Sequence, residues 1–163
     1  MEYSNMDAID LQLLGWLQDD ASRSNQWLAA QAGISPPTCL RRVRRLHESG
    51  LIERQVAILN PDRLAAVQGH GLACIVEVSL DRQGAEHMDA FEARAVAEPA
   101  VQQCWRVAPG PDFMLVVHTR DMPGYLAMAQ RLFTADANVR NAKAFFSTKR
   151  AKFETKLPLA HDS

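Results

Sequence analysis

The chain has 163 residues, 47% of them hydrophobic and 23% charged, so it is long enough to bury a core as one domain or as two small ones. No apolar run approaches the roughly 20 residues that cross a bilayer, so we expect a cytoplasmic protein without a membrane span or secretory signal. The three cysteines are far apart and outside any C-x-x-C spacing, which predicts packed thiols and neither a disulfide framework nor a metal site.

The first predicted helix covers residues 7–19. Apolar residues recur there at spacings of three and four, as on one stripe of an amphipathic helix: Met6, Ile9, Leu13, Trp16 and Leu17. Asp7 and Asp10 stand at its start, where a carboxylate accepts hydrogen bonds from unpaired backbone N–H groups.

Two further helices joined by a tight turn are predicted next. Ser24 suits the N-cap of a short second helix, and Gly33 suits its left-handed end. We expect Ser35 to cap the third helix, with Pro36 at its first position, and the helix to end near Gly50. Its expected inward stripe is Leu40, Val43, Leu46 and His47. This tight pair, with an arginine-rich second member, is typical of a helix-turn-helix.

The third helix is the candidate DNA-reading element. The formal net charge is only −1, but five arginines stand between residues 34 and 56 against two glutamates. A patch of this kind is enough, because only the face that meets phosphates must be positive. Turning each residue by about 100° places Thr38, Arg41 and Arg45 opposite the apolar stripe, with Arg42 and Arg44 on its flanks.

The chemistry of this helix suits a major groove. The arginine fork reaches guanine or phosphate oxygens, and free N–H groups at the Ser35 end suit a backbone phosphate. The candidate DNA contacts are Ser35, Pro36, Thr38, Arg41, Arg42, Arg44 and Arg45. Two alternatives stay open: the arginines solvate an exposed helix, or Arg42 pairs with an acidic residue of the first helix. We expect Cys39 to pack in the core.

The rest of the chain predicts a linker and an α+β domain. Residues 51–59 favour a strand or hairpin arm resembling a wing, and residues 60–71 a connection with about one helical turn. Beyond it we expect the order βαββαβ, a ferredoxin-like sandwich whose uncovered sheet face invites pairing with another copy. The predicted elements are strand 72–80, helix 84–97, strands 101–107 and 113–119, helix 122–135 and strand 139–148.

Several motifs resemble the Lrp/AsnC family of transcriptional regulators. They are Met6-Asp7-x-x-Asp10, Leu28-Ala29-x-x-x-Gly33-Ile34-Ser35, Ser35-Pro36-x-Thr38-Cys39-Leu40-x-Arg42-Val43-x-x-Leu46, Gly50-Leu51-Ile52 and Leu59-Asn60. Gly110-x-Asp112-Phe113, Tyr125 and Val139 match the family's C-terminal domain more loosely. The resemblance covers residues 6 to about 150 and is fairly specific in the helix-turn-helix.

The resemblance implies a sequence-specific DNA-binding regulator that is controlled by an amino acid or a related small metabolite. It implies a homodimer, often assembled into tetramers or octamers, with the effector bound near the loop between the second and third strands. The domains are then 1–60 (DNA binding), 61–71 (linker), 72–150 (effector binding and oligomerisation) and 151–163 (tail). Family members have a glycine where this chain has Pro109, which removes one backbone N–H donor.

The loop is also the best effector candidate on physical grounds. Its candidate residues are Ala108, Pro109, Gly110, Asp112 and Phe113. Glycine permits close backbone approach, Asp112 offers an acceptor to an α-amino group, and Phe113 or Trp105 offers an apolar wall. The alternatives are a turn carboxylate for Asp112, core or interface packing for Trp105, and turn geometry alone for Gly110.

Two other functions were weighed against a metabolite-gated regulator. An enzyme on a ferredoxin-like dimer needs positioned acid-base or metal groups, and the scattered histidines provide only a faint candidate in His118 near Asp121. We therefore expect no enzymatic activity, no metal and no cofactor. An architectural DNA-wrapping protein would use the basic stretch Lys143, Lys149, Arg150, Lys152 and Lys156, which also suits a solvated tail.

Overall fold

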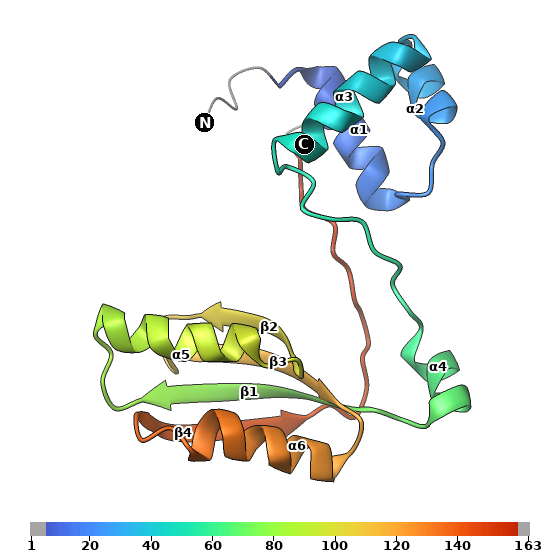
Figure 1. The fold of residues 1–163 in the computed structure, drawn as a ribbon. Coiled ribbons are helices and arrows are strands. Elements are labelled where there is room, and N and C mark those ends of the chain that lie inside the picture. Colours follow the sequence, from blue (N-terminus) through green and yellow to red (C-terminus); the bar gives the residue numbers. More distant parts are fainter. Residues whose placement is uncertain (1–5, 160–163) are drawn as a thin grey trace. The chain divides into compact units, whose positions relative to one another are not determined.

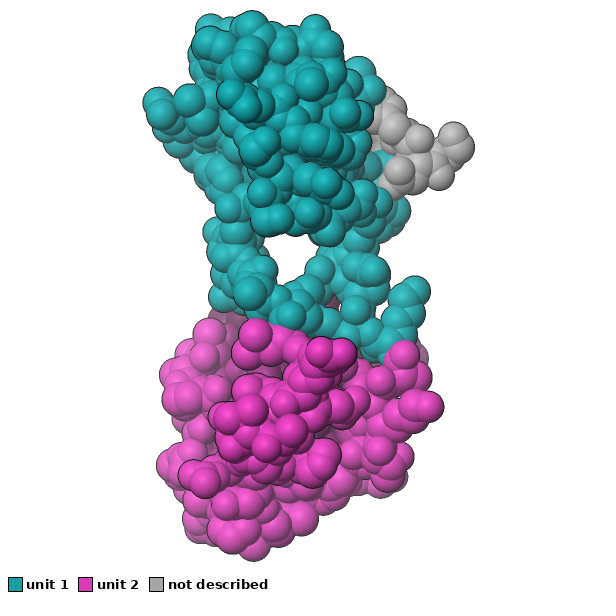
Figure 2. All heavy atoms as spheres, turned by 90° about the vertical axis from the view of Figure 1, so that its right-hand side faces the viewer, with its two compact units in different colours: residues 1–58, 152–163 teal, residues 59–151 magenta. Residues whose placement is uncertain are grey.

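The computed structural model describes residues 6–159, so the first five residues of the expected DNA-binding domain and the last four of the expected tail lie outside it. The chain divides into two compact units, coloured separately in Figure 2. One unit contains residues 1–58 and 152–163, and the other contains residues 59–151. No helix among the described residues is long and apolar enough to cross a membrane.

The first unit is a bundle of three helices (Figure 1): α1 (Ala8–Asp19), α2 (Asn25–Ala32) and α3 (Pro36–Glu48). The expected caps are confirmed. Asp7 and Asp10 form a reciprocal capping box on α1, and the Ser24 and Ser35 side chains accept from backbone N–H groups of α2 and α3. Gly33 ends α2 at φ +64°, a left-handed conformation that favours glycine. Local capping therefore sets the boundaries of these helices.

The core of this unit differs in detail from the predicted stripe. Its buried apolar residues are Leu13, Leu28, Ala29, Cys39 and Leu46. Val43 packs against them, but Leu40 is 50% exposed and His47 is exposed, so their predicted inward orientation is wrong. Cys39 takes the inward place beside Val43 and Leu46, because a period of 3.6 residues puts positions 39, 43 and 46 on one side. Burial also raises the pKa of the Cys39 thiol, as expected of an inert packed cysteine.

The segment after α3 carries no strand, so the predicted wing or hairpin arm over residues 51–59 is wrong. It is mostly exposed coil, including Val56 and Ile58, and no neighbouring strand within the described chain supplies ladder bonds. The following α4 (Pro61–Gln68) is longer than the single turn expected there. Asn60 begins it by accepting hydrogen bonds from the N–H groups of Asp62 and Arg63.

The second unit has the predicted βαββαβ order in a four-stranded antiparallel sheet, β2-β3-β1-β4. Leu72 lies opposite Thr119 at one end of the β1–β3 pair, and Val78 lies opposite Phe113 near the other. The elements are β1 (Leu72–Leu80), α5 (Ala85–Ala97), β2 (Val101–Arg106), β3 (Phe113–Thr119), α6 (Met122–Ala129), a π-helical turn η1 (Gln130–Thr134) and β4 (Val139–Phe146).

The helices α5 and α6 cover the same face of the sheet (Figure 1). Alternate residues of β1 and β3 point into this layer, as the period of two in a strand requires. Phe91 of α5 packs against Phe113 of β3, with ring centroids 4.8 Å apart. Val96 of α5 is 69% exposed, so it lies outside this buried layer.

The opposite face of the sheet carries no helix of the described chain. Ile75, Trp105 and Phe145 are 45%, 59% and 44% exposed, and the strand pairing puts Ile75 opposite both Val116 and Phe145. Trp105 lies opposite Met114 on the same face. The apolar residues therefore form a band across the outer surface of the sheet.

The C-terminal segment belongs to the first unit. The backbone N–H of Leu157 donates to the Gln18 side chain at 2.7 Å, and the Gln18 amide donates back to the Leu157 carbonyl at 3.2 Å. Lys156 forms an ion pair with Asp19 at 2.7 Å. The end of the chain thus contacts α1 through specific polar groups.

Candidate DNA-binding and effector-binding sites

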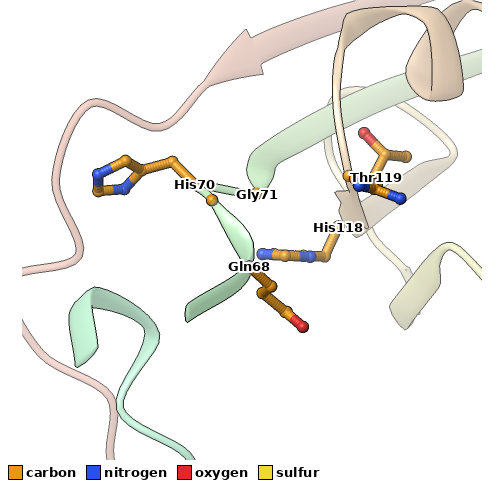
Figure 3. A pocket seen from close by; sticks show the side chains of 7 residues that line it. Gln68, His70, Gly71, His118 and Thr119 are labelled. Carbon is orange, nitrogen blue, oxygen red and sulfur yellow. The ribbon is translucent and has the colours of Figure 1, made fainter. Parts of the chain in front are cut away.

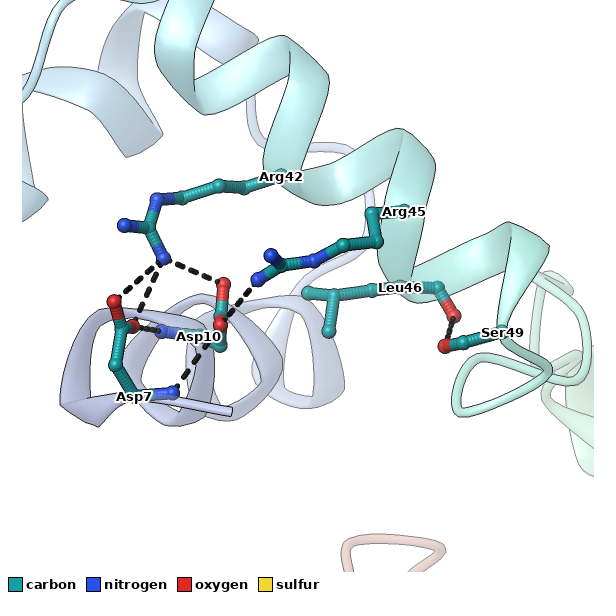
Figure 4. A network of polar contacts seen from close by, with 6 residues as sticks. All are labelled: Asp7, Asp10, Arg42, Arg45, Leu46 and Ser49. Carbon is teal, nitrogen blue, oxygen red and sulfur yellow. Dashed lines mark hydrogen bonds and ion pairs between the residues drawn. The ribbon is translucent and has the colours of Figure 1, made fainter. Parts of the chain in front are cut away.

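Two arginines of α3 bind two aspartates at the start of α1 (Figure 4). Arg42 Nη1 lies 2.9 Å from Asp10 Oδ1 and 2.8 Å from Asp7 Oδ2. Arg45 Nη2 lies 2.5 Å from Asp10 Oδ2. The Asp10 side chain is fully buried, so both of its oxygens are satisfied by a guanidinium instead of by water. We call Asp7, Asp10, Arg42 and Arg45 the α1–α3 ion-pair network.

This network decides between the two interpretations of Arg42. The arginine pairs with acidic residues of the first helix, as one alternative held, and its side chain is 21% exposed. Hydrogen bonds to Asp10 and then Asp7 raise the pKa of Arg42 above its usual value. The Asp10 backbone N–H, followed by Arg42, lowers the pKa of the Asp7 carboxyl. Arg42 is therefore charged and held on α1.

Arg45 lies on the exposed side of α3, as predicted, but its guanidinium has an unexpected partner on α1. It was placed opposite the apolar stripe, but its guanidinium reaches the buried carboxylate of Asp10, while its side chain remains 48% exposed. Asp10 lies three residues before Leu13, on the buried side of α1. A carboxylate in that place needs a cation from another helix, which the alternative for Arg42 anticipated, whereas the pairing with Arg45 was not predicted.

The outer surface of α3 is cationic. Arg41 and Arg44 are exposed, and Arg41, Arg42 and Arg45 line a hollow of about 310 Å³. The Arg42 Nε is buried and has no hydrogen-bond partner among the described residues. Arginine donors at such a surface bind phosphate oxygens or guanine edges.

The start of α3 is fixed by local hydrogen bonds. The Ser35 side chain accepts from the Thr38 backbone N–H at 3.4 Å, and the two hydroxyls lie 2.9 Å apart. The Asn25 amide donates to the Pro36 carbonyl at 2.8 Å, which ties α2 to the first turn of α3. Ser35 and Pro36 are exposed and Thr38 is partly exposed. Pro36 and Pro37 have no backbone N–H and the Thr38 N–H already donates to Ser35, so the free N–H groups expected in the first turn are missing and the hydroxyls of Ser35 and Thr38 are the groups left for a phosphate.

The candidate effector loop connects β2 to β3. Ala108, Pro109 and Gly110 are exposed, whereas Asp112 and Phe113 are buried. The Asp112 Oδ2 accepts from the Leu80 backbone N–H at 2.6 Å, and the Asp112 N–H donates to the Val78 carbonyl. One carboxylate oxygen therefore anchors the loop to the end of β1, which matches the alternative of a structural turn carboxylate.

The predicted apolar wall of this loop is not formed as expected. The Phe113 ring is 0% exposed and packs against Phe91, so it offers a ligand no surface. Trp105 lies on the uncovered face of the sheet, and its indole N–H donates to the Gln103 side chain at 3.1 Å. It therefore takes no part in the core of this chain. A strand alternates its side chains between two faces, and this alternation separates Trp105 from Phe113.

Comparison with known proteins agrees with both units. Residues 6–47 match the AsnC-type helix-turn-helix domain, and residues 73–157 match the Lrp/AsnC ligand binding domain. A leucine-responsive regulatory protein from Rhizobium meliloti is 35% identical over 147 residues, covering 90% of this chain and 92% of that protein.

Solved structures give the same result over nearly the whole chain. An AsnC family transcriptional regulator from Agrobacterium tumefaciens has a TM-score of 0.80 at 27% identity, covering 94% of this chain and 97% of that one. A transcriptional regulator from Neisseria meningitidis in complex with L-Met has a TM-score of 0.79 at 27% identity, with coverages of 96% and 98%. The helix-turn-helix, the ligand-binding domain and these relatives agree: the chain belongs to the Lrp/AsnC family of transcriptional regulators.

Proposed function

We propose that the chain regulates transcription by inserting α3 into the major groove of a specific double-stranded DNA site, under the control of an amino acid or a related metabolite. The observation that carries this proposal is the arginine surface of α3. Arg41 and Arg44 are exposed, while the α1–α3 ion-pair network holds the same helix against α1. A helix with a supported inner side and exposed arginine forks suits base and phosphate recognition.

The candidate DNA contacts divide by position. Ser35, Pro36 and Thr38 are proposed to meet the phosphate backbone at the open end of α3. Arg41 and Arg44 are proposed to reach bases or phosphates directly. Arg45 shares its guanidinium with Asp10 and contacts the DNA with the donors that remain, whereas Arg42 chiefly positions the helix.

Effector binding is proposed at the β2–β3 loop. Its exposed residues Ala108, Pro109 and Gly110 offer backbone groups to a ligand. The buried residues Asp112 and Phe113 fix the end of the loop, Asp112 by accepting a hydrogen bond from the Leu80 N–H. The matched ligand-binding domain and the L-Met complex of the Neisseria meningitidis relative support an amino acid as effector. A ligand acts on DNA binding only when it binds two states of the protein differently.

A homodimer is proposed to form on the uncovered sheet face, with tetramers or octamers as larger assemblies. The exposed apolar side chains of Ile75, Trp105 and Phe145 support this face as the contact. Two copies would present two α3 helices to a roughly palindromic site, about one DNA turn or a multiple of it apart. We further propose that the protein is cytoplasmic and works without enzymatic activity or a cofactor.

The test is fluorescence anisotropy of the full chain on its own upstream DNA and on scrambled DNA, with and without pooled amino acids. We expect preference for the native fragment and a change in affinity with the pool. Equal affinity for both fragments, unchanged by the pooled amino acids, would overturn the proposal. It would favour an architectural DNA-wrapping protein, whose phosphate contacts carry no sequence information.

A further inference from the structure

A polar hollow lies where α4 leads into β1, in the second unit. Its volume is about 360 Å³, which is enough for a small metabolite. The lining comes from residues 68–71 and from the end of β3, including Gln68, His118 and Arg120. Figure 3 shows the His118 ring lying beside Gln68 and Gly71, whereas the His70 ring points away from it.

The His118 ring is held by contact with a glycine. A Cβ built on Gly71 would lie 2.3 Å from Cε1 and 2.8 Å from Nε2 of His118. The ring therefore rests directly against the Gly71 backbone, in space that any other residue would fill. Gly71 does not have a left-handed φ, so this close approach, and not backbone freedom, explains the glycine.

The charge of the hollow is positive. Arg120 contributes a guanidinium, and no acidic side chain is part of the lining. The neighbouring Asp121 accepts the Gly124 N–H at 2.8 Å and so caps α6. The Thr119 hydroxyl donates to the Asp121 carbonyl, which leaves the guanidinium, the imidazole and the Gln68 amide as the donors that face the hollow.

These donors lack partners among the residues that the structure describes. Within residues 6–159, no hydrogen bond or ion pair engages the side chains of Gln68, His118 or Arg120. Arg94, Arg106 and Arg131 of the same unit are each paired with a carboxylate. Among the described residues Arg120 has no such partner, as is also true of Arg63, Arg82 and Arg140, but of these four only Arg120 lines the hollow.

We propose that this hollow binds a small oxyanion, a carboxylate or phosphate metabolite, between Arg120, His118 and Gln68. The arginine fork matches either group in two-point geometry. The site is separate from the β2–β3 loop: the Leu72–Thr119 and Val78–Phe113 pairs are six residue steps apart along β1, which is about 20 Å of strand. A bound anion joins the end of α4 to the end of β3. The proposal goes beyond the effector loop proposed above.

The experiment is calorimetric titration of the full chain with inorganic phosphate and, separately, with succinate. We expect at least one probe to bind, and Arg120→Gln to weaken it about tenfold or more, the equivalent of one charge-assisted hydrogen bond. Binding of phosphate alone or of succinate alone assigns the anion class, and both results support the site. Gly71→Ala should also weaken binding, because its Cβ displaces the His118 ring while every charge is kept.

Two matched variants serve as controls. Arg140→Gln removes an exposed arginine from β4 of the same unit, and Arg82→Gln removes an exposed arginine that follows β1. Both should bind the probe as the wild type does, and both, together with Arg120→Gln, should keep the wild-type thermal unfolding midpoint. The proposal is overturned when neither probe binds the wild type, or when Arg120→Gln binds as tightly as Arg140→Gln. Anisotropy on the upstream DNA is recorded in parallel, so failure of this site is separable from failure of DNA recognition.

Discussion

Arg42 of α3 and Asp10 of α1 lie 2.9 Å apart, although 32 positions separate them in the chain. The same carboxylate binds Arg45, so one buried aspartate anchors two arginines of the helix that is proposed to read DNA. The orientation of the candidate recognition helix thus depends on a charge in a different helix.

Asp10→Asn should lower the free energy of unfolding of the first unit by about 3 kcal/mol, because it leaves two guanidinium groups without their buried counter-charge. This loss is at the low end of the range expected when one partner of a buried ion pair is removed, because both arginine side chains keep some contact with water. Urea denaturation of the full chain measures it. Asp20→Asn is the control, because Asp20 follows α1 and forms only a surface ion pair with Arg23, and equal effects of the two variants would contradict the role of Asp10.

Acid should weaken the first unit through Asp7. Its pKa in the folded protein lies below the usual value of 3.8, chiefly because the Asp10 N–H and then Arg42 bind the charged carboxylate. Its stabilising contribution is complete above the unfolded pKa and is lost as pH falls through the lowered folded pKa. Asp7→Asn should therefore flatten the decline in stability below about pH 4. Thermal unfolding across this range tests it against Asp62→Asn, and unchanged acid sensitivity in Asp7→Asn would refute the assignment.

Arg41→Ala should weaken binding to the native DNA fragment by roughly 1 to 3 kcal/mol, the loss expected when a base-reading arginine is removed. Arg45→Ala should also lose affinity, and additionally lose stability through Asp10. Anisotropy titration and urea denaturation separate the two effects. Unchanged affinity in both variants would rule out the proposed docking of α3.

Gln18→Ala should destabilise the first unit by about 1 to 2 kcal/mol, because two hydrogen bonds to the Leu157 backbone are lost. Gln26→Ala, at an exposed glutamine of α2, provides a matched control. Thermal unfolding of the full chain compares the two. Identical midpoints would show that the contact between α1 and the C-terminal segment contributes nothing to stability.

Asp112→Ala should destabilise the second unit by about 2 kcal/mol, because the buried N–H of Leu80 loses its acceptor. Asp112→Asn keeps an acceptor oxygen and should lose clearly less. Denaturation of both variants gives the comparison. If Asp112→Ala is as stable as the wild type, the structural role of the Asp112 carboxylate is contradicted, and binding an effector amine becomes the better explanation of this residue.

The sequence by itself determined the order and type of the elements and the family. Local rules suffice for that: Ser24, Ser35 and Gly33 mark helix ends, and periods of two and 3.6 separate β1 from α5. Residues 51–59 show the limit of such rules. Their composition favours a strand, but a strand needs a partner, and the described chain supplies none.

Only the tertiary structure decided which side chains meet. Helical spacing places Arg45 on the outer face of α3, but a fully buried carboxylate from α1 binds it because an unpaired charge there costs more free energy than bending a long side chain inward. Phe113 and Asp112 belong to a loop motif in the sequence, yet packing against Phe91 and hydrogen bonding to Leu80 make both part of the fold. Local periodicity carries no information about such partners, because they come from distant segments that only folding brings together.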